Sequence, residues 1–297
     1  MESIRTIENI NGRFNVHCEF QCYDPSFETV ILVNGALATS TSFRQTVKYL
    51  KRRFNVLLFD APHAGQSRQY NAGAEGHLSK DDEVEILCSL IERFRPGYLI
   101  SISWGGVAAL LALARGRSSI KRAVIGSFSP VLNVPMLDYI SRAQALLGQL
   151  DREGAANLLN GTVGKYLPRL IKLYNYRYLS SLPLEDASQV AFHIRQILML
   201  DSENYVEKLS SIRIPLLFVN GELDEYTSAQ DVRALAHHIP QCEFLSVPDT
   251  GHFLDLESGA AWNLVSQRVN GFFTEWAPSR HAERAETLVC SAAAGPA

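Results

Sequence analysis

Short apolar runs recur along the chain, and most of the segments between them carry a helical pattern. The runs cover residues 29–36, 54–62, 97–103, 121–130, 214–224 and 242–252. Each run is nearly continuous in apolar residues, which is typical of parallel strands buried on both faces. Residues 80–94 place Val84, Leu87 and Ile91 on one stripe, after acidic residues that suit a helix N-terminus. The pattern predicts an α/β fold with a doubly wound, mostly parallel sheet.

The segment 131–213 is too long to be an unstructured connection. It carries a helical repeat with no clear strand, and Met136, Ile140, Ala143 and Leu147 recur at steps of three and four residues. We therefore expect a helical cap at 131–213, inserted into a core made of 1–130 and 214–276. The cap's apolar stripe could pack on the core, line a substrate cavity, or do both. Residues 277–297 have little apolar content and are expected to be poorly ordered.

Composition narrows the possible functions. The chain has 297 residues, 46% hydrophobic and 20% charged, with a net charge of −3, so nothing suggests nucleic acid as a partner. The N-terminus has no apolar signal-peptide core, and no run approaches the ~18 apolar residues of a membrane span. The five cysteines are odd in number and scattered, which favours free thiols in a cytoplasmic protein over a metal site. We expect neither a metal nor a cofactor.

The stretch Ser101-Ile102-Ser103-Trp104-Gly105 lies where a buried strand meets an alanine-rich helix. Hydrolases of the α/β type place a nucleophilic serine at such a join, in the motif G-x-S-x-G. The turn is tight, so the residues two before and two after the nucleophile must be small. Ser101 replaces the first glycine of the motif, and Ser103 becomes the predicted nucleophile. The alternative is an ordinary turn with incidental serines.

A serine nucleophile needs a base and an acid that orients the base, and in this fold they follow in the order Ser, Asp, His. Asp224 ends the fifth apolar run and His252 follows the sixth, at the carboxyl ends of strands where open α/β sheets place their sites. Taken singly, Asp224 could be a helix N-cap and His252 a buried core histidine. Other possible acids are Asp231, Asp249 and Asp255, none of which ends a strand.

Acyl transfer at Ser103 also requires donors for the oxyanion. We expect one to be the main-chain N–H of Trp104, directly after the nucleophile, and the other to be the N–H of Ala36 in Asn34-Gly35-Ala36. The stretch 59–67 contains an Asp-x-x-x-x-Gly-x-Ser pattern, which is a structural loop in hydrolases of this type. His63 lies within it, and we expect a loop role rather than a pocket-lining one.

Several motifs together resemble one branch of the α/β-hydrolase superfamily. They include "LVNGALATSTSF", "AGQSRQYN", "KDDEVEIL", "SISWGG", "DYISRAQALL", "NGELDEYT" and "GHFLDLES". In these motifs the sequence is similar to the rhamnosyltransferase A-chain family, the 3-(3-hydroxyalkanoyloxy)alkanoate synthases of rhamnolipid (biosurfactant) biosynthesis. In "FSPVLN" and "LYNYRYLSSL" it also resembles a sister family, the 3-hydroxyacyl-ACP:CoA transacylases or thioesterases.

The resemblance implies an acyltransferase that joins two (R)-3-hydroxyacyl chains of about ten carbons, delivered as acyl carrier protein (ACP) or coenzyme A (CoA) thioesters. Ser103, His252 and Asp224 would form the catalytic triad, through an acyl-Ser103 intermediate. A transacylase or thioesterase is the alternative. Two further alternatives on the same fold are a general carboxylesterase and a non-catalytic small-molecule receptor.

A carrier protein is strongly acidic, so it needs a local basic surface to dock on. The cap offers Lys165, Arg169, Lys172 and Arg177. The core offers a second group that is expected at the end of the sheet opposite the site, namely Arg115, Arg117, Lys121 and Arg122. We favour the cap group because the phosphopantetheine arm must reach Ser103. Each of these residues alone could equally be a solvated surface charge.

Overall fold

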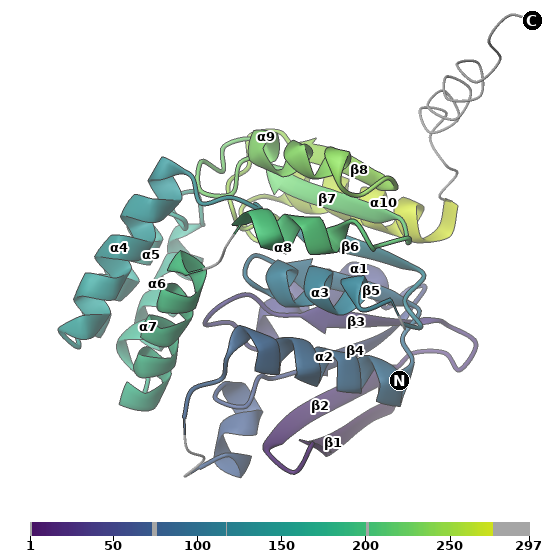
Figure 1. The fold of residues 1–297 in the computed structure, drawn as a ribbon, viewed down its shortest axis with the longest axis horizontal. Coiled ribbons are helices and arrows are strands. Elements are labelled where there is room, and N and C mark those ends of the chain that lie inside the picture. Colours follow the sequence, from purple (N-terminus) through teal and green to yellow (C-terminus); the bar gives the residue numbers. More distant parts are fainter. Residues whose placement is uncertain (1, 73–75, 117, 200–201, 276–297) are drawn as a thin grey trace, which may run out of the picture.

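A single eight-stranded sheet forms the centre of the molecule (Figure 1). The computed structural model describes residues 2–72, 76–116, 118–199 and 202–275. The strand order is β1-β2-β4-β3-β5-β6-β7-β8, and every pair from β4 to β8 is parallel. The strands are β1 (Glu2–Ile10), β2 (Phe14–Cys22), β3 (Thr29–Val33), β4 (Asn55–Phe59), β5 (Tyr98–Ile102), β6 (Arg122–Gly126), β7 (Leu216–Gly221) and β8 (Cys242–Val247). The six predicted strands are confirmed as β3 to β8.

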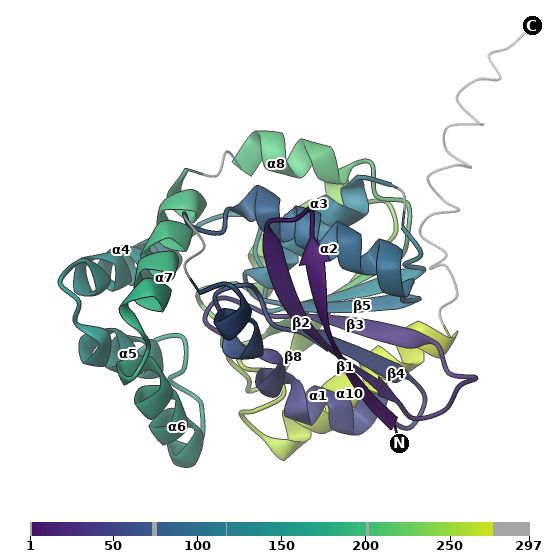
Figure 2. The same ribbon diagram turned by 90° about the horizontal axis from the view of Figure 1, so that it is seen from below.

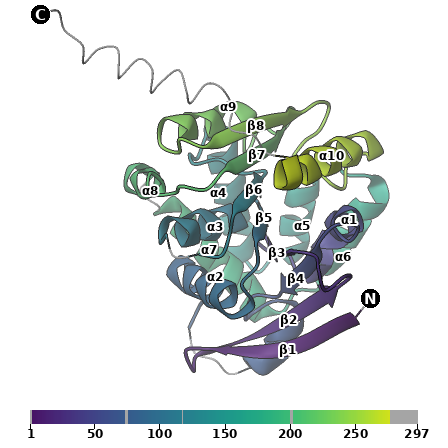
Figure 3. The same ribbon diagram turned by 90° about the vertical axis from the view of Figure 1, so that its right-hand side faces the viewer.

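Helices cover both faces of the sheet, as Figure 3 shows. On one face lie α2 (Lys80–Phe94), α3 (Gly105–Ala114) and α8 (Ser202–Leu209), and on the other α1 (Arg44–Leu50) and α10 (Gly259–Glu275). Each face has its own buried apolar cluster, because the central strands present apolar side chains in both directions. Short helical elements complete the core, namely η1 (Ser40–Phe43), η2 (Gly65–Tyr70), α9 (Ala229–Val232) and η3 (Arg233–His237).

The N-terminal hairpin of β1 and β2 was not among the predicted strands. The two strands pair antiparallel, and β2 also pairs antiparallel with β4. Asn11 and Gly12 lie in the turn between the paired residues Ile10 and Phe14, with φ of 54° and 69°, and an Asn-Gly pair with both residues at positive φ is a usual signal of a hairpin turn. This signal is present in the sequence. The largely exposed β1, however, lacks the continuous apolar run that marks the other strands.

Four helices between β6 and β7 form the cap beside the carboxyl ends of the parallel strands (Figures 1 and 2). They are α4 (Val134–Gly148), α5 (Arg152–Gly161), α6 (Arg169–Ser180) and α7 (Leu184–Leu198). The last of these is fastened to the core. Gln189 bonds both the main-chain N–H and C=O of Leu78 at 2.9 and 2.8 Å, and Asp186 pairs with Arg68.

The helix α8 lies within the segment 131–213 that was expected to form the cap, but it packs on the core. Tyr205 and Leu209 of α8 are buried in the same apolar cluster as α2 and α3. The spatial cap is therefore the α4–α7 group, and α8 returns the chain to the sheet. The predicted tail 277–297 lies outside the described residues.

Candidate active site

Ser103 occupies the sharp turn between β5 and α3, with φ of 55°. Its main-chain N–H donates to Gly126 O at 2.8 Å, and its carbonyl accepts from Gly106 N at 2.8 Å. A Cβ on Gly105 would lie 2.4 Å from Asn34 O, which explains why a small residue is needed there. Ser101 is fully buried in β5, and its Oγ has no hydrogen-bond partner among the described residues. Ser103 is therefore the serine presented by the turn, whereas Ser101 belongs to the strand interior.

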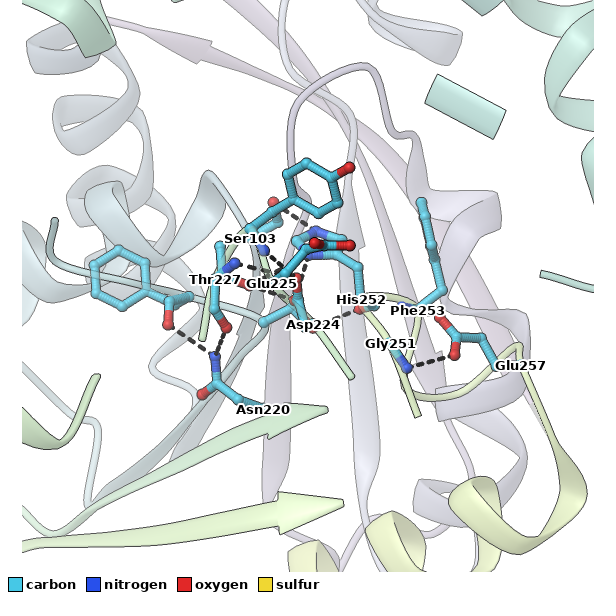
Figure 4. Close-up of polar contacts among 12 residues, drawn as sticks. Ser103, Asn220, Asp224, Glu225, Thr227, Gly251, His252, Phe253 and Glu257 are labelled. Carbon is cyan, nitrogen blue, oxygen red and sulfur yellow. Dashed lines mark hydrogen bonds and ion pairs between the residues drawn. The ribbon is translucent and has the colours of Figure 1, made fainter. Parts of the chain in front are cut away.

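His252 reaches Ser103 from the loop after β8 (Figure 4). Its Nε2 lies 3.1 Å from Ser103 Oγ, and its Nδ1 lies 2.8 Å from Asp224 Oδ2. The imidazole is only 7% exposed. The three residues thus form one hydrogen-bonded chain, the arrangement in which a histidine can take a proton from a serine hydroxyl.

Asp224 is held in the turn after β7 by hydrogen bonds from several donors (Figure 4). Its Oδ1 accepts from the N–H groups of Tyr226 and Thr227 at 3.0 and 3.1 Å, and its Oδ2 accepts from Thr227 Oγ1 at 2.5 Å. Burial tends to raise the pKa of Asp224, but the charge of His252 and the hydrogen bonds from His252 and Thr227 lower it below its usual value. The carboxylate therefore stays ionised beside the imidazole.

The other candidate acids do not bond His252. Asp231 Oδ2 accepts from Asn133 Nδ2, and Asp255 Oδ2 accepts from Thr46 Oγ1. Asp249 is exposed, with φ of 51°. Of the four aspartates considered, only Asp224 is hydrogen-bonded to the imidazole, and the N-cap of α9 is Ser228 rather than Asp224.

A carboxylate that the sequence analysis did not single out holds the histidine loop in place (Figure 4). Glu257 Oε2 accepts from Gly251 N at 2.6 Å, and its Oε1 accepts from Phe253 N at 2.9 Å. The two N–H groups flank His252 in the chain. In addition, Ser127 Oγ donates to His252 O at 2.5 Å. The main chain of His252 is thus fixed independently of its side chain.

Ala36 and Trp104, the predicted oxyanion donors, both line the cavity that contains Ser103. Within the described part of the chain, neither main-chain N–H donates a hydrogen bond. A Cβ on Gly35 would come within 3.2 Å of Ser103 Cβ, so the loop of Ala36 lies directly against the serine. Two free N–H groups beside a serine can bind the oxyanion of a tetrahedral intermediate.

The side chain of Trp104 is bound to helix α2 and faces the cap. Its Nε1–H donates to Glu83 Oε2 at 2.9 Å. His193 of α7 lies against the same indole, with ring centroids 5.6 Å apart, and its Nε2 is 3.1 Å from Glu83 Oε1. Glu83 of α2 therefore links the core, the turn at Ser103 and Trp104 (the elbow) and cap helix α7 in one network. Neither Glu83 nor His193 was predicted as a site residue.

The cavity above Ser103 has a volume of about 1010 Å³, at the upper end of the range for small-molecule sites. Much of its wall is apolar and comes from the cap. These apolar side chains include Met136, Ile140, Ala143, Leu147, Leu159, Val190, Ile194 and Ile197. Ile140 and Ala143 also belong to the apolar cluster inside the cap. The predicted stripe of α4 therefore both packs and lines the cavity.

A smaller cavity of about 100 Å³ lies beside the loop that carries Ala36. It shares Ala36, Trp104 and His193 with the larger cavity. His63 lines it, contrary to the role expected from the sequence, and burial followed by nearby positive groups lowers the pKa of His63. The surrounding loop is built as expected. Asp60 accepts from the N–H groups of Ser40 and Gln66 at 2.7 and 2.8 Å, and a Cβ on Gly65 would collide with its carboxylate.

The two predicted basic groups differ in their surroundings. In the core group, Arg115 pairs with Glu85, Lys121 pairs with Glu28, and Arg122 donates to the carbonyls of α10. Arg117 lies outside the described residues. In the cap group, Lys165 pairs with Glu225 and Lys172 donates to Lys165 O at 2.7 Å. Arg169 and Arg177 of α6 are exposed.

Across the ranges that the structure describes, no group of three or more His, Cys, Asp or Glu side chains could hold a metal ion. No described helix is long and apolar enough to cross a membrane.

Comparison with known proteins agrees with this architecture. Residues 30–263 match the alpha/beta hydrolase family. An (R)-3-hydroxydecanoyl-ACP:CoA transacylase of Pseudomonas aeruginosa is 47% identical over 268 residues, covering 90% of this chain and 88% of the relative. A protein of the same description from Pseudomonas putida is 44% identical, covering 89% of each chain. Among solved structures, the enol-lactonase of Burkholderia xenovorans superposes with a TM-score of 0.74, at 16% identity over 91% of this chain and 100% of the other.

Proposed function

This chain belongs to the alpha/beta hydrolase family, and we propose that it transfers an (R)-3-hydroxyacyl group from the thiol of ACP to the thiol of CoA, through an ester on Ser103. The observation that carries this proposal is the 47% identity to a transacylase over 90% of the chain. Sequence motifs favoured a synthase that joins two hydroxyacyl chains. The relatives favour the alternative, so the transacylase is the main proposal.

The first half of the reaction forms the acyl-enzyme. Ser103 Oγ, 3.1 Å from His252 Nε2, attacks the thioester carbonyl carbon while the imidazole takes the hydroxyl proton. The carbonyl oxygen becomes an oxyanion, which the N–H groups of Ala36 and Trp104 bind. Asp224, 2.8 Å from Nδ1, stabilises the imidazolium. The tetrahedral intermediate then expels the thiolate, which leaves with the proton from His252.

The second half repeats these steps with CoA as the acceptor. His252 removes the thiol proton, the sulfur attacks the ester carbon, and the oxyanion again lies at Ala36 and Trp104. Collapse breaks the ester bond, and His252 returns its proton to Ser103 Oγ. Water competes with the thiol for the same intermediate, so the site must exclude it. The apolar cap wall over Ser103 suits this need.

Product analysis tests the proposal. The protein is given (R)-3-hydroxydecanoyl-ACP with CoA, and the products are identified by mass spectrometry. We expect 3-hydroxydecanoyl-CoA, and no product when Ser103 is replaced by alanine. Free 3-hydroxydecanoate as the main product would make the protein a thioesterase. A dimeric hydroxyacyl ester would make it the synthase. No turnover of the thioester would contradict the proposed function.

We further propose that ACP docks on α6. Ile171, Tyr174 and Asn175 of this helix line the cavity, while Arg169 and Arg177 lie exposed on it. Leu170, Leu173 and Tyr174 are 61, 44 and 59% exposed, so the same helix also presents an apolar strip. An acidic carrier bound there would have its phosphopantetheine arm next to the cavity. Lys165 and Lys172 contribute less than the sequence suggested, since both bond within the protein.

A further inference from the structure

The proposed substrate differs from an ordinary fatty acyl thioester by one hydroxyl group. That hydroxyl lies on C3, two carbons from the carbonyl carbon that Ser103 would attack. The group that recognises it must therefore face the cavity close to the elbow formed by Ser103 and Trp104. A buried polar group that bonds a substrate hydroxyl gives strong selectivity, because an analogue without the hydroxyl leaves it unpaired.

Three polar side chains that line the cavity near Ser103 are already engaged. Ser127 Oγ donates to His252 O, and Thr227 Oγ1 donates to Asp224. Asn34 Nδ2 donates to Phe59 O at 3.2 Å, and its Oδ1 is enclosed by protein. None of these three presents an unused polar atom to the cavity in the described structure.

His193, in contrast, has a ring nitrogen without a hydrogen-bond partner among the described residues. It lines both cavities, and its ring lies 5.6 Å from that of Trp104, the residue next to the proposed nucleophile. Its Nε2 is 3.1 Å from Glu83 Oε1 and 2.9 Å from Gln189 Nε2. Its Nδ1 bonds no described residue and is not among the fully enclosed polar atoms. Nδ1 is therefore the ring nitrogen that remains accessible.

The imidazole is also held in a defined orientation, as a recognition group should be. Gln189, one helical turn before it, is fixed by two hydrogen bonds to the main chain of Leu78. Glu83 is fixed by the indole N–H of Trp104. Both contacts to the ring are made at Nε2, so they restrict the ring without using Nδ1.

We infer that His193 recognises the C3 hydroxyl of the acyl chain through Nδ1, and so determines the preference for (R)-3-hydroxyacyl groups. This inference rests on the proposed function. It holds for either neutral tautomer. If Nε2–H donates to Glu83, Nδ1 accepts a hydrogen bond from the substrate hydroxyl, and if Nε2 accepts from Gln189, Nδ1–H donates to the hydroxyl oxygen. His193 is a specificity residue and takes no part in the proton transfers at Ser103.

The test compares (R)-3-hydroxydecanoyl and decanoyl thioesters of ACP, with CoA as acceptor, in the wild-type protein and in His193→Phe. Phenylalanine retains a ring against Trp104 and removes both nitrogens. We expect kcat/KM for the hydroxylated substrate to fall about tenfold or more, the effect of one hydrogen bond of roughly 1.5 kcal/mol. We expect the value for decanoyl-ACP to change by less than about twofold, and preference for the (R) over the (S) hydroxyacyl enantiomer to be lost.

Tyr139→Phe is the matched control. Tyr139 lines the same cavity from helix α4, its ring lies beside that of Tyr226, and burial raises the pKa of its phenol to about 12. We expect this variant to keep the ratio between the two substrates. His193→Gln, which retains a donor and an acceptor, should keep part of the preference and serves if His193→Phe does not fold.

Three results would overturn the inference. These are an equal loss on both substrates in His193→Phe, an unchanged ratio in that variant, and a ratio that collapses in Tyr139→Phe instead. A wild-type protein that makes acyl-CoA without preferring the hydroxylated substrate would also reject His193 as the recognition group while leaving acyl transfer intact. Absence of any acyl-CoA in the wild type would instead reject the proposed function.

Discussion

Glu257 gives the sharpest test of how the histidine loop is held. Its two carboxylate oxygens accept the N–H groups of Gly251 and Phe253 at 2.6 and 2.9 Å, one on each side of His252. Glu257→Ala removes both bonds and leaves two main-chain donors to water. Hydrogen bonds to a charged group contribute roughly 1.5–3 kcal/mol each. Because Glu257 is only half-buried, we expect a loss of about 2 kcal/mol in the free energy of unfolding.

The effect on turnover should be smaller than the loss of His252 itself. The carbonyl of His252 stays bonded to Ser127 at 2.5 Å and its Nδ1 to Asp224 at 2.8 Å, so the imidazole shifts without being released. A displacement of about 1 Å in a reacting group costs roughly 100-fold. We therefore expect kcat to fall between about 10- and 100-fold, with little change in KM. In Glu257→Gln we expect kcat to fall nearly as far, because the amide NH₂ of glutamine would face one of the two N–H donors.

Steady-state transfer of a 3-hydroxyacyl thioester gives kcat and KM, and thermal unfolding gives the stability. Glu222 provides the control, because its carboxylate also accepts a main-chain N–H of this loop, that of Asp249 at 3.2 Å, but it is exposed and bonds neither residue that flanks His252. We expect Glu222→Ala to retain wild-type kcat. Full activity in Glu257→Ala, or an equal decrease in Glu222→Ala, would refute the reasoning.

Further predictions concern the elbow, a buried acid and the docking helix. Ser103→Ala should lower kcat by a factor on the order of 10⁴–10⁶, whereas Ser101→Gly should stay active because the buried Oγ of Ser101 bonds nothing that is described; an inactive Ser101→Gly would show that the turn needs the hydroxyl. Burial raises the pKa of Asp255 to about 6, so the folded state binds its proton more tightly than the unfolded state and this residue's contribution to stability declines as pH rises from about 4 to 6. The free energy of unfolding of Asp255→Asn, relative to wild type, should therefore increase over that window, and a pH-independent difference measured by thermal unfolding would contradict this. Replacing Arg169 and Arg177 together by glutamate should raise KM for an ACP thioester and leave a short soluble thioester unaffected, and an equal loss on both would indicate a damaged fold instead of a lost docking site.

Sequence reasoning found the elements that bury a continuous apolar run. Strands β3 to β8 and helix α2 all follow directly from hydrophobic pattern, since their burial depends on the residues themselves. The hairpin of β1 and β2 was not predicted, because β1 is mostly exposed and lacks a continuous apolar run. Its pairing depends on the turn at Asn11 and Gly12. Helix α8 was assigned to the cap because periodicity shows that a helix has an apolar face but not which neighbour covers it.

The residues of the candidate site also fall into those that the sequence predicted and those that it did not. Ser103, Asp224 and His252 could be predicted because each follows a strand and their order along the chain matches a known arrangement. Glu83, His193 and Glu257 could not, because they lie on helices or in a loop where glutamate and histidine are common. Their roles arise from contacts such as that between His193 and Glu83, which are 110 positions apart and meet only because cap helix α7 packs beside core helix α2.

Because the triad lies on the core and much of the cavity wall lies on the cap, structural neighbours and sequence relatives give different information about function. The triad geometry depends on strand ends and turns in the core, and a lactonase 16% identical superposes on this chain, so that likeness shows the fold alone. Much of the apolar wall that would select an acyl group and exclude water comes from the cap helices α4 to α7. Relatives that are 44–47% identical over 89–90% of this chain must include at least part of this cap. Substrate class is therefore better inferred from those relatives than from the fold, and side chains of the cap such as His193 are where the proposed specificity is most directly tested.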